Sequence, residues 1–208
     1  MEYKINLDSV KEYYEKRIVE YGYSPLGVDW NSSLSQTNRF DQIIKVCNPD
    51  TPFSIIDYGC GYGALADYLI KKGFNINYHG FDIVEKAIEG ARLHYTSEPK
   101  CTFYNNAIDL PVSDYVVASG IFNIRSNNSF DTWTEYVIQV LSKFNDLSIK
   151  GFASNFLTKY SDHESMRPDL YYADPCHLFD ACKRLFSKNV ALLHDYQLYD
   201  FTLIIRKD

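Results

Sequence analysis

The stretch "SIIDYGCGYG", residues 54–63, decides the fold class of this chain. A short apolar run ends at Asp57, and glycines then follow at every second position, at Gly59, Gly61 and Gly63. Glycine permits a sharp turn and leaves no Cβ between the backbone and a ligand. We therefore expect a strand that ends in a glycine turn, and a helix that starts there beside a bound molecule.

From residue 52 onward, short apolar strands alternate with helical segments, which is typical of a parallel sheet with helices on both faces. The expected strands are 53–57, 75–82, 101–105, 114–122, 147–157, 189–196 and 199–207. The expected helices are 63–73, 84–96, 130–144 and 174–186. The connection between the last two strands is too short for a parallel crossover, so this pair must be antiparallel. The sequence predicts an α/β fold with seven mostly parallel strands and the last one reversed.

The N-terminal part reads as two helices, over residues 10–22 and 35–47, joined by a loop with Pro, Gly and Asn-Ser-Ser breakers. Asp8 or Ser9 is expected to cap the first helix, and Gly22 to end it. We expect residues 1–50 to form a helical cap over a ligand site. Residues 51–208 would form the ligand-binding domain, with the whole chain as one structural domain.

The composition excludes several classes of protein. With 46% hydrophobic and 23% charged residues the chain is typical of a globular protein. A net charge of -6 without a basic stripe argues against nucleic acid as a partner. No apolar run is long enough to span a membrane, and the charged N-terminus has no signal-peptide core. Five cysteines without a C-x-x-C pair indicate a reduced, cytoplasmic protein.

A second motif lies about 20 residues beyond the glycines. Asp82 stands at the carboxyl end of the second expected strand, where ligands of open parallel sheets bind and where a carboxylate can accept hydrogen bonds from both ribose hydroxyls. The dinucleotide pattern G-x-G-x-x-G is not matched, because the third glycine comes one residue early. An NAD-linked dehydrogenase is therefore disfavoured.

The glycine turn, its strand context and the acidic strand end together resemble the class I S-adenosylmethionine-dependent methyltransferases, over residues 35–208. The resemblance implies a Rossmann-like fold, S-adenosylmethionine as cofactor and S-adenosylhomocysteine as product. It also implies that the turn, with Asp57 ahead of it, contacts the methionine part of the cofactor. Asp82 would hold the ribose, with Ile83 beside the adenine.

Further positions match the family in part. Asn106, followed by Ala107, stands where the family commonly has an Asp that binds the adenine amino group, and an amide oxygen can accept the same hydrogen bond. Ser119 falls at the end of the fourth strand, which in the family reaches the cofactor and the reaction centre. From the N-terminal region, Arg39 is expected near the carboxylate of the cofactor.

Two segments are candidates for the acceptor site. The long connection after the fifth strand offers Arg167, Tyr171 and Tyr172 as substrate-binding residues, and His177 just inside the next helix as a catalytic one. Arg167 has the alternative of being simply solvated. A zinc site from Cys176, His177 and Cys182 has poor spacing, and no metal is expected.

The second segment follows the sixth strand. His194 and Asp195 form a candidate general base with its carboxylate, or equally a hydrogen-bonded hairpin histidine. Tyr196 and, from the N-terminal cap, Trp30 are further substrate-binding candidates.

The sequence thus predicts methyl transfer to a small-molecule acceptor, preferably at oxygen, because aromatic and histidine-rich loops suit a hydroxylated or anionic substrate. The alternatives are a methyltransferase acting on RNA or protein, and a non-catalytic module that only binds the cofactor. An Asn-Pro-Pro-Tyr-type motif is absent after the fourth strand, where "SGIFN" stands instead. Monomer and homodimer both stay open.

Overall fold

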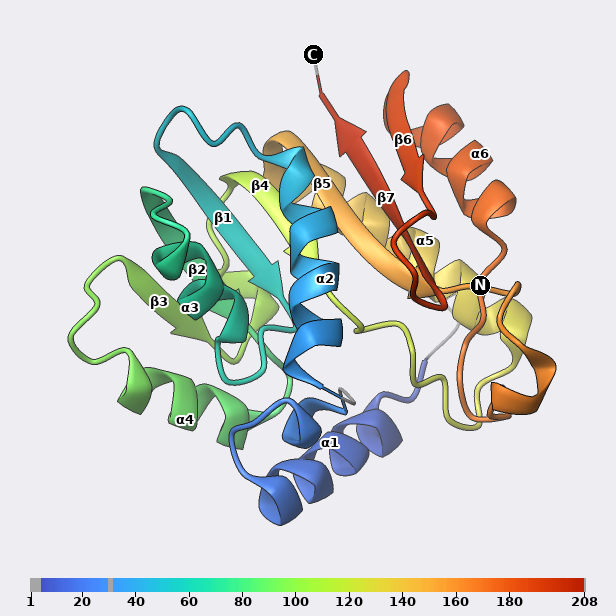
Figure 1. Ribbon diagram of the computed structural model, residues 1–208, viewed down its shortest axis with the longest axis horizontal. Helices are drawn as coiled ribbons and strands as arrows, with labels where there is room; N and C mark the ends of the chain where they lie inside the picture. Colours follow the sequence, from blue (N-terminus) through green and yellow to red (C-terminus); the bar gives the residue numbers. More distant parts are fainter. Residues whose placement is uncertain (1–4, 30–31, 208) are drawn as a thin grey trace.

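The computed structural model describes residues 5–29 and 32–207 and contains one seven-stranded sheet (Figure 1). The strand order is β3-β2-β1-β4-β5-β7-β6. The strands are β1 Phe53–Tyr58, β2 Ile76–Phe81, β3 Cys101–Tyr104, β4 Ser113–Ala118, β5 Ser148–Leu157, β6 Asn189–Leu193 and β7 Asp200–Arg206. All seven predicted strands are present.

The direction of the strands agrees with the prediction. β7 pairs antiparallel with both β5 and β6, whereas the remaining pairs are parallel. β6 therefore runs in the same direction as β5, and its carboxyl end lies at the same edge of the sheet as those of β1, β2 and β4. The predicted α/β, Rossmann-like fold with a reversed last strand is confirmed.

Six α-helices are described: α1 Asp8–Tyr21, α2 Ser33–Ile43, α3 Ala64–Lys71, α4 Glu85–His94, α5 Phe130–Leu147 and α6 Pro175–Leu185. Helices α2, α3 and α4 contribute to one hydrophobic core, which covers one face of the sheet. Helices α5 and α6 contribute to the core on the other face. This is the two-faced arrangement that right-handed crossovers produce on either side of β1 and β4. Among the described residues, no helix combines the length and the apolar content that a membrane span requires.

The core around α5 is centred on Trp133, which is fully buried. Its indole Nε1 donates a hydrogen bond to the Phe122 carbonyl at 2.9 Å, so the one polar atom of the ring is satisfied. Because Phe122 lies in the segment after β4, this bond fixes that segment against α5.

The first helix begins differently from the prediction. Leu7 occupies the N-cap of α1 and makes no side-chain capping bond. The Asn6 side chain instead accepts a hydrogen bond from the Asp8 backbone N–H at 2.8 Å. An acceptor two residues upstream thus takes the place of the expected Asp8 or Ser9 cap, so that prediction is wrong. Gly22, with φ 66°, ends the helix as predicted.

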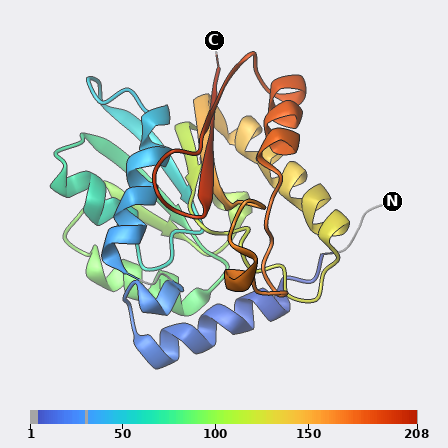
Figure 2. The same ribbon diagram turned by 45° about the vertical axis from the view of Figure 1, so that its right-hand side comes forward.

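The N-terminal elements reach the edge of the sheet where the parallel strands end. Figure 1 shows α1 lying across this edge, below the arrowhead of β1, with the 3₁₀ turn η1 (Leu26–Val28) beside it, and in Figure 2 α1 again runs along the bottom of the molecule. α2 is tied to the far part of the sheet by an ion pair between Arg39 and Asp200 at the start of β7. Both side chains are buried, so this contact positions α2 against β7.

Candidate functional site

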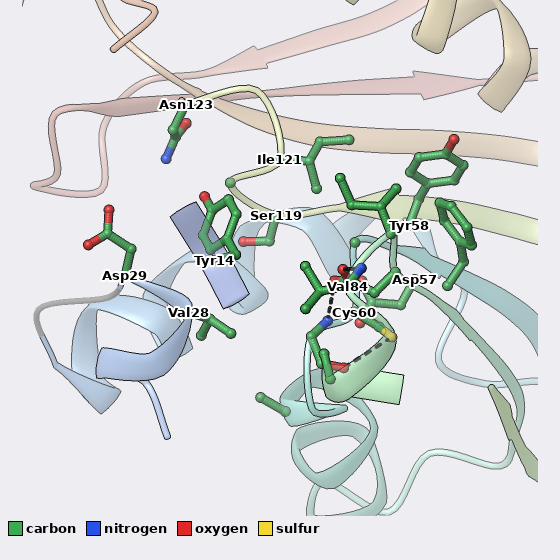
Figure 3. Close-up of a pocket in the computed structure, with 18 of the residues that line it drawn as sticks. Tyr14, Val28, Asp29, Asp57, Tyr58, Cys60, Val84, Ser119, Ile121 and Asn123 are labelled. Carbon is green, nitrogen blue, oxygen red and sulfur yellow. Dashed lines mark hydrogen bonds between the residues drawn. The ribbon is translucent and has the colours of Figure 1, made fainter. Parts of the chain in front are cut away.

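A pocket lies at the carboxyl ends of β1, β2 and β4, between the glycine turn on one side and α1 and η1 on the other (Figure 3). This is the edge where open α/β sheets bind ligands. The lining residues are Leu7, Val10, Tyr14, Ile18, Val28, Asp29, Gln36, Phe40, Asp57, Tyr58, Gly59, Cys60, Gly61, Ala64, Leu65, Phe81, Asp82, Ile83, Val84, Ala87, Ser119, Gly120, Ile121, Asn123 and Tyr136.

The glycine turn has the left-handed backbone conformation that its glycines led us to expect. Gly59, Gly61 and Gly63 have φ values of 85°, 54° and 89°, a region that other residues rarely adopt. A Cβ on Gly59 would lie 2.1 Å from Cγ2 of Ile121. The backbone N–H of Gly59 donates to the Phe81 carbonyl at 2.6 Å, which pins the turn to the end of β2. The turn is therefore tightly packed on both sides.

Asp82 connects the end of β2 with this turn. Its Oδ2 accepts a hydrogen bond from the Gly61 N–H at 2.9 Å, and its Oδ1 accepts one from the Val84 N–H at 2.8 Å. Burial raises the pKa of Asp82, and these backbone donors oppose the rise. Each oxygen retains a second lone pair for a ligand.

Asp57 lies beneath the turn and is 4% exposed. Its Oδ2 accepts a hydrogen bond from the Tyr78 hydroxyl at 2.6 Å. Burial raises its pKa to about 7, with a smaller contribution from the charge of Asp82, while the Tyr78 bond lowers it. The Asp57 carboxyl group therefore changes its charge near neutral pH.

This shift predicts a pH dependence of stability. An unfolded Asp titrates near 3.9, so between about pH 4 and 7 the folded chain holds the Asp57 proton and the unfolded chain does not. As the pH rises through this window, the free energy of unfolding should fall by up to about 1.4 kcal/mol per pH unit. Urea unfolding at pH 5 and pH 7.5 should show a smaller fall for Asp57→Asn than for the parent. Equal falls in both proteins would contradict the shift.

The described polar lining contains no cationic side chain that would repel a positively charged ligand. It includes Asp29, Asp57 and Asp82, and none of the described lining residues is a lysine or an arginine. S-adenosylmethionine carries a positive sulfur, and its ribose needs an acceptor such as Asp82. The glycine turn offers a surface that a single Cβ would obstruct. The residues present therefore fit this cofactor.

Of the residues predicted to bind the cofactor, six line the pocket: Asp57, Gly59, Gly61, Asp82, Ile83 and Ser119. Gly63 immediately precedes α3 and packs against Tyr95. Asn106 is exposed, and it and Ala107 are not part of the described lining. The Nε of Arg39 donates to Asp200, and its Nη1 donates to the Ser35 carbonyl at 3.0 Å. Its role at the cofactor carboxylate stays a prediction.

The tyrosines predicted to bind substrate are engaged within the protein. The Tyr171 hydroxyl pairs with Thr134 at 2.9 Å, and the Tyr196 hydroxyl pairs with Thr202 at 3.0 Å. The Tyr172 hydroxyl accepts a bond from the Arg167 N–H at 3.0 Å. These three do not line the pocket. Trp30 lies outside the described residues.

The predicted catalytic residues lie apart from the pocket, and His177 also lies apart from His194 and Asp195. His177 faces a surface groove between α5 and α6, on the opposite side of the sheet from α2. His194 and Asp195 are exposed and follow β6, three strands from β4 and hence about 14 Å across the sheet. Their catalytic roles stay predictions.

Arg167 lies nearer to the pocket than these residues, beside helix α1 of the N-terminal cap. Its guanidinium binds Asp169 at 2.6 Å and also lies within reach of the Tyr13 hydroxyl on α1. That hydroxyl donates to Asp29 at 2.9 Å. The loop after β5 thus contacts the cap next to a pocket residue, although Arg167 itself does not line the cavity.

Sequence reasoning missed several polar residues of the pocket. Tyr14, Tyr58 and Tyr136 line it, and their hydroxyls make no hydrogen bond within residues 5–29 and 32–207. Asp29 and Asn123 were missed as well. Tyr14 could have been predicted from the sequence, because Val10, Tyr14 and Ile18 recur every four residues and so share one face of a helix.

Within the described part of the chain, no candidate metal site accompanies the pocket. The described residues contain no group of three or more His, Cys, Asp or Glu arranged to hold an ion. All five cysteines carry free thiols.

Comparisons with known proteins agree with the geometry. A family model described as a methyltransferase domain matches residues 49–196. The curated protein named "Putative methyltransferase Rv1506c", from Mycobacterium tuberculosis, is 48% identical over 164 residues, which cover 79% of this chain and 99% of that protein.

Solved structures share the fold at low sequence identity. The magnesium protoporphyrin IX methyltransferase of Synechocystis, solved with bound S-adenosylmethionine, is 16% identical with a TM-score of 0.67, and the match covers 100% of both chains. The N-methyltransferase NodS of Bradyrhizobium japonicum, solved with S-adenosylhomocysteine, is 11% identical with a TM-score of 0.67. That match covers 96% of this chain and 99% of NodS.

Proposed function

The chain belongs to the class I S-adenosylmethionine-dependent methyltransferases, and from that premise we propose that it methylates an oxygen atom of a small molecule. The observation that carries the proposal is the extent of the pocket. Its lining continues from the glycine turn past Ser119 to Asn123 and Tyr14. This extension supports an enzyme with an acceptor site rather than a module that only binds the cofactor.

The proposed roles of the residues at the site are as follows. The glycine turn and Asp57 would hold the methionine part of the cofactor, and Asp82 would accept hydrogen bonds from its ribose. Ile83 would pack beside the adenine, and Asn106 and Ala107, which are outside the described lining, would have to be reached by the adenine amino group. When bound, S-adenosylmethionine would supply an activated methyl group, with S-adenosylhomocysteine as the product. Because such a methyl group is already reactive, holding the acceptor in line can supply roughly 7–11 kcal/mol of the acceleration.

Two further features support a small acceptor inside the cell. The net charge of -6 disfavours RNA, whose binding requires positive charge. The five free thiols suit a reducing compartment such as the cytoplasm. Residues 1–50, which supply α1, η1 and α2, act in this proposal as the cap over the site.

The test is a calorimetric titration of the protein with S-adenosylmethionine, with NAD as control, followed by assays of S-adenosylhomocysteine release. Binding of S-adenosylmethionine alone is expected, with release stimulated by phenols and alcohols more than by matched amines. Stimulation by bulk RNA or by protein instead would favour the alternative acceptors. Binding of NAD in place of S-adenosylmethionine would overturn the proposal.

A further inference from the structure

The pocket has two ends of different chemical character. In Figure 3 the labelled Cys60 and Asp57 lie at the end formed by the glycine turn, whereas Tyr14, Asp29 and Asn123 lie at the opposite end. Ser119 lies between the two groups. Since the glycine turn and Asp82 belong to the cofactor, the opposite end is available for another molecule.

Two side chains at this opposite end have hydrogen-bonding groups without a partner among the described residues. The Tyr14 hydroxyl and the Asn123 amide make no hydrogen bond to any part of the chain that the structure describes. Burial, together with the nearby charge of Asp29, raises the pKa of Tyr14, so its hydroxyl stays protonated. A protonated hydroxyl and an amide each donate and accept hydrogen bonds. Polar groups in such positions are normally satisfied by water or a ligand.

The charged groups around this end are already paired within the protein, including Arg167, whose guanidinium binds Asp169. Asp29 is the carboxylate here, and both of its oxygens are already engaged: Oδ2 accepts from the Tyr13 hydroxyl at 2.9 Å, and Oδ1 pairs with Arg17 at 3.1 Å. The described lining offers no lysine or arginine to an anion. A cation would find no free carboxylate at this end, and with S-adenosylmethionine bound it would also face the positive sulfur, which repels it.

Apolar side chains from the N-terminal region also line the pocket. Leu7 and Val10 of the α1 region contribute to this lining, and Val10 is almost completely buried. Apolar walls with a few placed polar groups are typical of small-molecule sites. They favour a hydrocarbon ring or chain over a fully polar ligand.

We propose that Tyr14 and Asn123 form the acceptor subsite, and that it takes an uncharged molecule with a hydroxyl group on a hydrocarbon framework. The inference rests on the proposed function and adds the charge class of the acceptor. Tyr14 and Asn123 position the hydroxyl group by donating to it and accepting from it. The N-terminal helix is thereby part of the substrate site, and the segment after β4 completes it.

The test measures fragment binding rather than turnover. The protein, saturated with S-adenosylhomocysteine, is titrated with benzyl alcohol, benzylamine and benzoate, and binding is followed by ligand-detected NMR. These probes share a ring and differ in charge. Benzyl alcohol should bind most tightly, and benzoate about 10-fold or more weakly. Tighter or equal binding of benzoate or benzylamine, or no binding of any probe, would overturn the proposal.

Variants then test the residues. Tyr14→Phe and Asn123→Ala should each weaken benzyl alcohol about 2- to 10-fold, the effect of one lost hydrogen bond. Tyr160→Phe, in an exposed tyrosine outside the pocket lining, is the matched control and should bind it like the parent. Unchanged binding in Tyr14→Phe and Asn123→Ala would contradict the subsite.

The same samples separate this inference from the proposed function. S-adenosylhomocysteine affinity should stay within about twofold of the parent in both variants, because neither residue lies at the glycine-turn end. If the parent protein does not bind S-adenosylhomocysteine, the proposed function itself fails. If it does, and the probes are not distinguished by charge, only the subsite assignment fails.

Discussion

A Gly59→Ala variant is expected to lose at least about 100-fold in affinity for S-adenosylmethionine. At φ 85° a residue with a Cβ costs roughly 1–2 kcal/mol relative to its preferred conformations. The new Cβ would also lie 2.1 Å from Cγ2 of Ile121, so the turn or the segment after β4 has to move. Both form the pocket, so the displacement acts directly on the cofactor site. Calorimetric titration measures the loss.

Gly73→Ala is the matched control for this change. Gly73 follows α3 with φ 80°, and a Cβ there would meet nothing within 4 Å. It carries the same conformational penalty without the clash and outside the pocket. Both variants should therefore unfold at lower temperature, by about 2–4 °C for each kcal/mol lost. Only Gly59→Ala should lose binding, and equal affinities in the two would show that the tight turn does not matter for the cofactor.

Asp82→Ala is expected to have an effect of similar size for an electrostatic reason. A hydrogen bond to a charged group contributes about 1.5–3 kcal/mol, and the carboxylate can accept one from each ribose hydroxyl. The change also removes the acceptor of the Gly61 and Val84 N–H groups, which loosens the turn. We expect a loss of about 10²- to 10⁴-fold in affinity.

The comparison variants for Asp82 separate charge from shape. Asp82→Asn keeps one oxygen acceptor and should bind with intermediate affinity. Asp109→Ala removes an exposed carboxylate near the end of β3 and should bind like the parent. Circular dichroism checks that each variant is folded. An Asp82→Ala protein that binds S-adenosylmethionine within twofold of the parent would exclude the ribose contact.

The strands and helices were predictable because the signals are local. Buried parallel strands such as β1 and β4 read as short apolar runs bounded by Gly and polar residues. The reversal of β7 followed from the length of one connection. The start of α1 was not predicted, because the side-chain oxygen that accepts a hydrogen bond from the Asp8 N–H belongs to Asn6, which precedes the helix.

The two ends of the pocket also differ in how far they can be predicted from the sequence. The glycine-turn end is assembled from one strand–turn–helix motif and from Asp82, 19 to 25 residues further on by sequence, so the pattern is visible in the chain. The opposite end combines Tyr14 and Asp29 of the N-terminal region with Asn123, which follows β4 and is remote from both in the sequence. Helical spacing marks Tyr14 as facing inward, but only the packing of α1 across the sheet edge shows what it faces.

The histidines illustrate a further limit. His194 follows a strand whose carboxyl end lies at the correct edge of the sheet, as expected. The order β5-β7-β6 nevertheless places that strand at the outer margin. Position along a sheet edge depends on the strand order, which the residues around His194 do not encode.

The strand order also has a consequence for biosynthesis. β7 is translated after every other strand, yet it lies between β5 and β6 and pairs with both. During synthesis β6 cannot join the sheet until residues 200–206 have left the ribosome, and until then β5 presents an unpaired edge. Such edges recruit other chains into aggregates. A polypeptide halted before β7 would therefore be prone to aggregation, even though every residue of the pocket had already been made.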